Sequence, residues 1–475
     1  MFKGERRQVH PGLHLGFGLL TALACWISLH SAGNLPFIIL FLFRYVRVLG
    51  NLHSYLFLYR VATAPKDARH KPRNVAVLLQ TVGDMGVQFE ECVKSIVRQK
   101  PYVLILCTTS SNGNLQRLEA ARDEIQLQLK EEAEDLQVPI HCQAIEEPNR
   151  RKQFLHSLET PISLPVTPSD SAVHLATPHP QHLESVLDNK AITTLIMCDD
   201  HCYPGPGLIE HVLAPVNISE NVWVVNVSER VRRLRQPNWT KDFINYVACV
   251  FAARHNFESA ATYARDGGHL DVSGRFVLMR KEFWQEETTR QAYVTEYWGG
   301  SDQLLIPDDD AWIGRQCART GHEVAFQLDE KHMLEIDLGN KDWAKLKNQL
   351  LRWARTSFRT GWSALYDDET WKTKPWTAYA ANLAGITNLT LLLDLLIGWN
   401  LWCATGLLAQ PWFRLSFLGF WLFTKCLEPS GHWRNVKRDL IYAIPGIIFG
   451  WYYSIIKIYA FFTVYDMGWS GQAFK

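Results

Sequence analysis

The apolar residues of this chain are concentrated at its two ends. Residues 13–29 carry no Asp, Glu, Lys or Arg, and residues 35–49 form a second apolar run after a short break. Three more runs, at 380–408, 412–427 and 440–464, lie toward the other end. A helix needs roughly 20 apolar residues to cross a bilayer, so these runs predict membrane helices. Hydrophobic residues make up only 47% of the 475, so the middle of the chain is expected to form a water-exposed domain.

The charges beside the first two runs predict their orientation. Basic residues flank the pair on both outer sides, whereas the loop between the runs is uncharged; they are Lys3, Arg6, Arg7, Arg44, Arg47 and Arg60. Cytosolic flanks are enriched in Lys and Arg, so the domain that follows is expected in the cytosol. A secretory signal peptide is the alternative for the first run, but no small-residue cleavage site follows it. At the other end, residues 440–464 either cross the membrane or dip into it.

These patterns divide the chain into four predicted parts. Residues 1–60 form a transmembrane hairpin and residues 71–361 a cytosolic domain. Residues 362–379, rich in Trp with interleaved Lys and Asp, form an interfacial helix, and residues 380–475 form further membrane or interfacial helices. Inside the cytosolic domain, residues 161–190 are rich in Pro, Ser and His without periodicity and are expected to be an insertion loop.

Overall charge and cysteine content narrow the range of functions. The net charge of +1 gives no reason to expect a nucleic-acid partner, because such proteins carry a strong basic excess. The ten cysteines are scattered along the chain, which is typical of reduced thiols in a cytosolic domain.

Short apolar runs alternate with helical patterns from residue 71 onward. Residues 74–79 and 103–107 have the composition of strands, and residues 89–98 between them that of an amphipathic helix. This alternation predicts an α/β domain with a mostly parallel sheet. The same order of strand, helix and strand begins the nucleotide-binding half of many α/β domains.

A further buried strand is predicted at residues 191–197, and it leads into Asp199, Asp200 and His201. Ligands of open α/β sheets bind at the carboxyl ends of the strands. Carboxylates are hard ligands that suit Mg²⁺ or Mn²⁺, and an imidazole tolerates Mn²⁺ better. We therefore predict a divalent-metal site with Mn²⁺ favoured and with His201 and Asp200 as ligands. The alternative is a capped turn ahead of Pro204.

A run of acids opens another predicted helix, which continues to Arg319. Asp308, Asp309 and Asp310 are adjacent, and their mutual repulsion is expected to raise the proton affinity of at least one of them. Such a group is suited to take a proton from a hydroxyl. The alternative is a purely structural acidic cap at a helix N-terminus.

The stretch from Gln349 to Arg359 precedes the C-terminal apolar runs. As a helix, it places Gln349, Arg352, Thr356 and Arg359 on one face. Guanidinium groups grip phosphate oxygens in a two-pronged fashion, so this face suits a pyrophosphate. The alternative is an amphipathic helix with solvated arginines, whose apolar stripe of Trp343, Leu346, Leu350 and Trp353 packs on a core.

The pattern Gln349-x-x-Arg352-Trp353 resembles the signature of processive family 2 glycosyltransferases, the group of hyaluronan, cellulose and chitin synthases. The longer Arg-Trp-x-Arg-Thr-Ser-x-Arg run, residues 352–359, is most similar to hyaluronan synthases and fungal type 2 glycosyltransferases. This resemblance implies a GT-A-like nucleotide-sugar domain inserted between N-terminal and C-terminal transmembrane helices. It also implies a UDP-sugar donor, Mn²⁺ or Mg²⁺, a growing polysaccharide acceptor, and a multi-pass enzyme in the plasma membrane.

The resemblance also assigns roles to individual residues. Asp310 matches the general base, with Asp309 beside it. The nucleotide sugar is assigned to Thr81, Asp84, Arg151, Lys152, Asp199, Gln349 and Arg352. The acceptor is assigned to Ser273, Gly274 and Trp353. The sequence departs from the family at residues 108–111, which are Thr and Ser where a second acid pair is common, and at Trp469-Ser470-Gly471, which lacks a terminal basic residue.

Three other functions fit the same motifs. An enzyme of this chemistry could add a single sugar to a lipid instead of building a polymer. The unusual His201 and the missing acid pair would also fit an inactive membrane scaffold. A transporter with a regulatory cytosolic domain is the third alternative.

Overall fold

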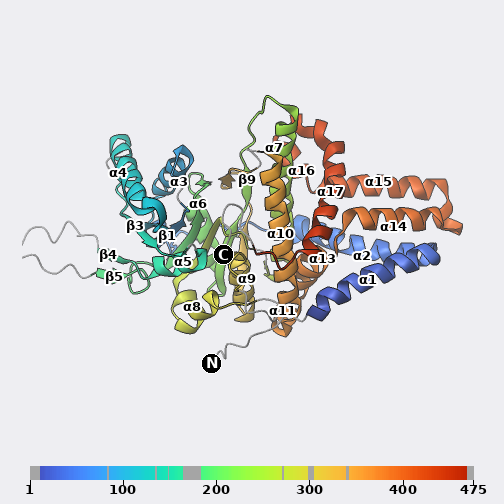
Figure 1. Cartoon of the computed structure of the whole chain (residues 1–475), viewed down its shortest axis with the longest axis horizontal. Helices are drawn as coiled ribbons and strands as arrows, with labels where there is room; N and C mark the ends of the chain where they lie inside the picture. The colour runs from blue at the N-terminus through green and yellow to red at the C-terminus, as the bar shows by residue number, and fades with distance from the viewer. Residues whose placement is uncertain are drawn as a thin grey trace, which may run out of the picture.

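The chain folds into an α/β body and a bundle of apolar helices that projects from it (Figure 1). The computed structural model describes residues 11–82, 85–133, 136–147, 149–163, 183–269, 272–297, 304–338 and 342–467.

A seven-stranded sheet forms the centre of the body, with the strand order β11-β8-β10-β6-β1-β2-β3. Every neighbouring pair is parallel except those of β10, which runs antiparallel to both β6 and β8. The strands are β1 (Val75–Gln80), β2 (Val103–Thr109), β3 (Ile140–Ile145), β6 (Thr194–Asp199), β8 (Val222–Val227), β10 (Phe276–Arg280) and β11 (Glu323–Gln327). The predicted mixed, mostly parallel sheet is confirmed.

The central strands are apolar on both faces because helices cover both. Val75, Val77 and Leu79 of β1 pack into one core, and the intervening Ala76 and Leu78 pack into the other. This follows from the two-residue period of a strand. Strands buried on both sides are expected to be nearly continuous apolar runs, as β1 is.

Helices from distant parts of the chain form the two covering layers. The first core is closed by α3 (Val87–Val97), α4 (Asn114–Glu132), α6 (Leu208–Ile218), α7 (Trp239–Asp266) and α10 (Trp343–Leu365). The second is closed by α5 (Arg150–Leu158), α8 (Glu287–Val294) and α9 (Asp309–Arg319). The predicted apolar stripe of α10 does pack on the first core, with Leu346 and Leu350 buried.

Two small sheets complete the body. β12 (Leu334–Ile336) pairs antiparallel with β7 (Cys202–Pro204) and parallel with β9 (Glu229–Val231). β4 (Pro161–Ser163) pairs with β5 (Leu183–Ser185) and so joins the two ends of the predicted insertion loop. Residues 164–182 of that loop lie outside the described part of the chain.

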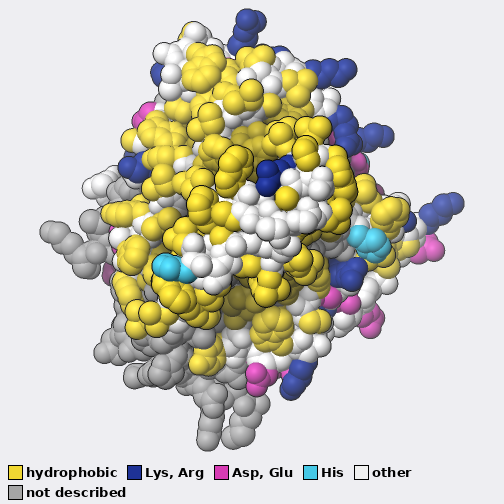
Figure 2. Space-filling model, turned by 90° about the vertical axis from the view of Figure 1, so that its right-hand side faces the viewer, with side chains coloured by type: hydrophobic (Ala, Val, Ile, Leu, Met, Phe, Trp, Pro, Cys, Tyr) yellow, Lys and Arg dark blue, Asp and Glu magenta, His cyan; other side chains and the backbone are white. Residues whose placement is uncertain are grey.

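The apolar helices lie together at the opposite end of the molecule from β3 and α4 (Figure 1). They are α1 (Pro11–His30), α2 (Asn34–His53), α14 (Thr390–Trp402) and α15 (Pro411–Leu427). Figure 2 shows hydrophobic side chains over most of this end. Two stretches, Asn34–Leu58 and Lys437–Phe462, are long and apolar enough to cross a membrane by length and composition. The second includes α17 (Ala443–Phe462), which packs along α10.

The segment between α10 and α14 is more broken than the sequence predicts. Where one interfacial helix was expected at 362–379, the chain forms the end of α10, α11 (Asp368–Thr373), α12 (Pro375–Thr377) and a short π-helix, Ala378–Leu383. The apolar run at 380–408 is likewise interrupted between α13 (Ala384–Thr387) and α14. Lys374 precedes Pro375, and a residue before proline is disfavoured in helical geometry, which accounts for one of these breaks.

Candidate active site

A cavity lies where the carboxyl ends of β1 and β6 meet α5, α9 and α10. Its lining is Gln80, Thr81, Val82, Arg150, Gln153, Asp199, Asp200, Ile306, Pro307, Asp309 and Arg352. Gln80 and Asp199 are directly opposite in the parallel pair of β1 and β6, so the two strands end at the same level. This is the edge at which open α/β sheets bind their ligands.

Arg150 is the cation at the centre of this cavity. Its guanidinium lies 2.5 Å from the Asp199 carboxylate and 3.4 Å from that of Asp309. Burial opposes the charge of Arg150, but Asp199, Asp309 and Asp310 outweigh it and raise its pKa. Arg150 therefore stays charged and joins acids that come from β6 and from α9.

The backbone of Gly274 connects Arg150 with Asp310. The Gly274 carbonyl accepts a 2.7 Å hydrogen bond from Arg150, and the Gly274 N–H donates to Asp310 at 3.1 Å. The Ala311 N–H also donates to Asp310, at 2.7 Å. A Cβ at Gly274 would lie 3.0 Å from the Asp310 Cβ and 3.2 Å from the Arg150 guanidinium, so a side chain here would require one of these neighbours to shift. The carboxylate of Asp310 is thus held by backbone donors at the first turn of α9, where the helix dipole favours negative charge.

Asp200 and His201 offer ligand atoms beside the cavity. The Asp200 carboxylate accepts a 2.7 Å hydrogen bond from Thr81, and it lies 4.0 Å from His201 Nε2. Burial raises the pKa of Asp200, and the neighbouring His201 partly opposes that shift. The buried His201 Nδ1 has no hydrogen-bond partner among the described residues. This carboxylate and imidazole fit a divalent metal ion, whereas Asp199 is turned toward Arg150.

Arg352 approaches the same cavity from α10. Its pKa is lowered by burial, an effect that Asp310 opposes and Arg275 adds to. An arginine remains charged at neutral pH even so. Trp353, the next residue, stacks on Phe251 of α7 at a ring-centroid distance of 4.8 Å, and the Arg275 guanidinium lies 5.3 Å from its ring.

Further along α10, Arg359 does not face the cavity. Its side chain is 1% exposed and pairs with the fully buried Asp308 at 2.7 Å, and it also donates to the Val464 carbonyl after α17. Thr356 donates to Asp308 at 2.6 Å. The expectation that Arg359 and Thr356 share one pyrophosphate-binding face with Arg352 is therefore wrong. Seven residues make nearly two helical turns, so Arg359 points the same way as Arg352 but lies roughly 10 Å further along the axis. There the buried Asp308 pairs with Arg359 and accepts from Thr356.

Several of these carboxylates, with Arg352, lie in a span that matches a known family. Residues 172–356 match the family model described as "Glycosyltransferase like family 2". This part of the chain is therefore similar to family 2 glycosyltransferases. That span contains Asp199, Gly274, Asp310 and Arg352.

Three fungal proteins named "Type 2 glycosyltransferase" are similar to almost the whole chain. The protein of Pyricularia oryzae is 26% identical over 446 residues, which are 92% of this chain and 81% of that protein. Those of Gibberella zeae and Zymoseptoria tritici are 25% and 24% identical over 92% of this chain, and 75% and 83% of their own lengths.

A solved structure shows a more distant likeness. It is titled "Mannosyltransferase PcManGT from Pyrobaculum calidifontis in complex with GDP-Man and Mn2+", and it is 13% identical with a TM-score of 0.48. The match covers 92% of this chain and 99% of that one. A likeness at this level carries no argument about the sugar or the metal used here.

The basic turn at the start of α5 places its cations differently from the prediction. Arg151 is buried, donates to the Tyr293 carbonyl and pairs with Glu296 at 2.9 Å. Lys152 pairs with Glu147. Neither residue lines the cavity. Arg150, which was not singled out from the sequence, is the basic residue of this turn that does line it.

The N-cap of α5 explains why Arg150, rather than Arg151 or Lys152, lines the cavity. The Asn149 side chain accepts hydrogen bonds from the backbone N–H groups of Arg151 and Lys152, so the helix begins at Arg150. The first helical residue lies nearest the carboxyl end of the sheet. The sequence signal was an Asn directly before a run of basic residues. Recognising Asn149 as a helix N-cap would have predicted Arg150 as the first helical residue and as the cation at the cavity.

The remaining predicted residues have varied surroundings. Ser273 is buried and donates to Glu229, which also pairs with Arg275 at 2.6 Å. Gln349 is half-buried on α10 and does not line the cavity. Asp84 and the Trp469-Ser470-Gly471 element lie outside the described residues.

Proposed function

We propose that this protein is a membrane-embedded, inverting, metal-dependent glycosyltransferase that polymerises a β-linked polysaccharide from a UDP-sugar and exports it. The observation that carries the proposal is the meeting of Asp199, Asp309 and Arg352 in one cavity, with Asp310 held beside it. The fungal relatives favour a product of the cell wall or cell surface made at the plasma membrane. The catalytic domain would face the cytosol, where UDP-sugars are available.

In this reaction Asp310 takes the proton of an acceptor hydroxyl, and the oxygen attacks the anomeric carbon. The bond from that carbon to UDP breaks, and UDP leaves with the electron pair. Gly274 and Ala311 orient Asp310 for this role through their N–H groups. Arg352 stabilises the charge that develops on the departing diphosphate. A Mn²⁺ or Mg²⁺ ion held by Asp200 and His201 would neutralise part of the same charge.

A second cavity supports a route for the acceptor. It lies among α2, α7, α14 and α17, and its lining includes Phe251 and Tyr453. Because Phe251 stacks on Trp353, the aromatic pair lies between this cavity and Arg352. A growing sugar chain could pass along aromatic rings from the reaction site toward the apolar helices.

The same cavity also favours a second function, transfer of a single sugar to a lipid. Its lining holds more cations than acids: Glu428 faces Arg44, Arg47, Arg254, Lys425 and Lys457. Asp394 and Glu258 pair with Arg44 and Arg47, and the remaining positive charge suits an anionic lipid head group. A lipid acceptor would place its chain among the apolar helices and its head group near Trp353.

The test is a survey of UDP-sugars, with Mn²⁺ or Mg²⁺, using the purified full chain in lipid nanodiscs. UDP release that is lost in Asp310→Asn and kept in the exposed Asp368→Asn supports the enzyme assignment. Carbohydrate of high molecular weight from UDP-sugar alone supports polymerisation, whereas labelled sugar confined to the lipid extract supports the second function. An absence of UDP release with every sugar favours the inactive scaffold.

A further inference from the structure

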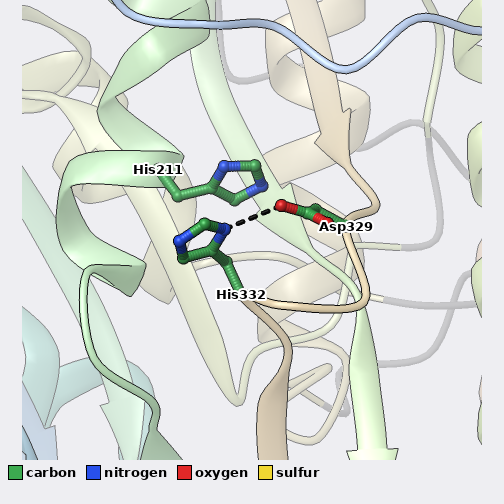
Figure 3. Close-up of side chains that lie close together, drawn as sticks. All are labelled: His211, Asp329 and His332. Carbon is green, nitrogen blue, oxygen red and sulfur yellow. Dashed lines mark hydrogen bonds and ion pairs between the residues drawn. The ribbon is translucent and has the colours of Figure 1, made fainter.

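A second cluster of metal-ligating side chains lies apart from the active-site cavity. It consists of His211 on α6 with Asp329 and His332 in the turn between β11 and β12, and a nitrogen or oxygen atom of each lies within 4.8 Å of the others. Figure 3 shows one ring nitrogen of each histidine directed toward the Asp329 carboxylate. None of these residues lines the cavity around Arg150.

One atom of this cluster has no evident structural role. His332 Nδ1 is hydrogen-bonded to Asp329 at 2.7 Å, and the two imidazole rings stack at a centroid distance of 4.8 Å. His211 Nε2, in contrast, is buried and makes no hydrogen bond to any described residue. An unsatisfied buried polar atom costs roughly 1–3 kcal/mol, so a ligand at this position would remove a penalty.

We propose that His211, Asp329 and His332 form a second, zinc-type metal site that clips α6 to the turn between β11 and β12. Two imidazoles and one carboxylate are a donor set that suits Zn²⁺, with water in the fourth position. A set made only of oxygen atoms would favour Mg²⁺ or Ca²⁺ instead.

The side chains need only a small adjustment to bind the ion. Tetrahedral ligands about 2.0–2.1 Å from Zn²⁺ lie roughly 3.3 Å from one another. The atoms that are up to 4.8 Å apart must therefore close in by about 1.5 Å, and the 2.7 Å pair of His332 and Asp329 must open slightly. His332 exchanges its hydrogen bond to Asp329 for the metal by carrying its proton on Nε2.

The surroundings hold the ligands in place. The Lys331 N–H donates to the second oxygen of Asp329 at 3.2 Å. The Gln327 amide donates to the His211 carbonyl at 3.0 Å, and it also bonds both backbone groups of Ala62, in the segment after α2. Because the turn leads into β12, and β12 pairs with β7 directly after His201, the ion would brace the strand next to the active site.

The experiment uses the full chain in detergent, stripped with EDTA, titrated with Zn²⁺ and passed through gel filtration. Asp200→Asn serves as the background so that zinc in the active-site cavity is not counted. We expect one equivalent of zinc per chain and a higher midpoint of thermal unfolding. Losing a group that only hydrogen-bonds to a metal ligand weakens metal binding by roughly 10–100-fold. Because His211 and Asp329 are proposed as ligands themselves, adding His211→Asn or Asp329→Asn to the background should weaken zinc binding by more than this.

The matched control is His156→Asn, which changes an exposed histidine of α5 and should keep the full equivalent. Asp329→Asn lies in a turn, so it tests the proposal even where His211→Asn does not fold. Cobalt gives an independent readout, because its visible absorption reports histidine ligation and should be lost in the same variants. The proposal is overturned if the background protein binds no zinc, or if both variants retain the equivalent.

Discussion

Two clusters of aspartate and arginine both include an acid of the run 308–310 and an arginine of α10, but they lie in different environments. Asp308 and Arg359 pair in the interior, with 0% and 1% of their side chains exposed. Asp199, one of the acids around Arg150, is 35% exposed. Asp308, the acid of the first cluster, pairs with Arg359 in the interior, whereas Asp199 and Asp309 pair with Arg150 and also line the cavity. Neighbouring acids of the run 308–310 therefore face different surroundings, Asp308 the interior and Asp309 the cavity.

The largest effect is expected from Asp310→Asn, because an amide cannot accept the acceptor's proton. The rate of sugar transfer should fall by about 10²–10⁴-fold, measured as UDP release, while the midpoint of thermal unfolding stays near that of the wild type. Asp368→Asn, an exposed change on α11, is the matched control. A variant that still transfers sugar at the wild-type rate would remove Asp310 from the catalytic role.

In the buried cluster, Asp308→Asn should lower the stability of the protein more than the rate of sugar transfer. Removing one partner of a buried ion pair leaves Arg359 uncompensated and costs about 3–5 kcal/mol. The expected result is a large fall in the unfolding midpoint that the double variant Asp308→Asn/Arg359→Gln partly restores. If the single variant unfolds like the wild type but loses activity, Asp308 belongs to the catalytic cluster instead.

A third test separates two neighbouring arginines. Arg150→Gln should lower transfer strongly, because it removes the cation between Asp199 and Asp309. Arg151→Gln should mainly destabilise the protein by about 1–3 kcal/mol, because it breaks buried bonds to Glu296 and Tyr293. Kinetics and thermal unfolding of both variants check this, and the reverse pattern would show that the two roles are exchanged.

The pH dependence of stability gives a smaller effect. Burial works to raise the pKa of Asp308, but Arg359 outweighs it and the pKa ends below the ordinary value. A carboxyl group whose pKa is lowered by folding stabilises the protein above its unfolded pKa of about 3.9. That contribution disappears as pH falls through the folded pKa. The stability difference between the wild type and Asp308→Asn should therefore be constant from neutral pH to about pH 4–5 and shrink below it.

The smallest effect is expected at an exposed ion pair outside both clusters. Arg98 and Glu132 lie 2.8 Å apart with nearly half of each side chain exposed. Exposed pairs contribute about 0–1 kcal/mol, so Arg98→Ala should change neither transfer nor the unfolding midpoint measurably. A large loss in this variant would indicate that the assays report general damage to the chain.

Much of the α/β body could be predicted because it follows from local patterns. The strand expected at 191–197 is β6, and the strands and helix expected between residues 74 and 107 are β1, α3 and β2. The antiparallel insertion of β10 between β6 and β8 could not be predicted in the same way. Strand order depends on long-range pairing, which leaves no periodic trace in the sequence.

The sequence by itself determined which residue types meet: acids at the end of β6 and the start of α9, glycine between them, and arginine on α10. Only the tertiary structure decided which members of each group share the cavity. Asp309 and Arg150 line it, whereas Asp308, Arg359 and Arg151 are paired in the interior. The physical reason is that a buried charge must find a partner, and the available partner, Arg359 for Asp308 or Glu296 for Arg151, comes from an element distant in the chain.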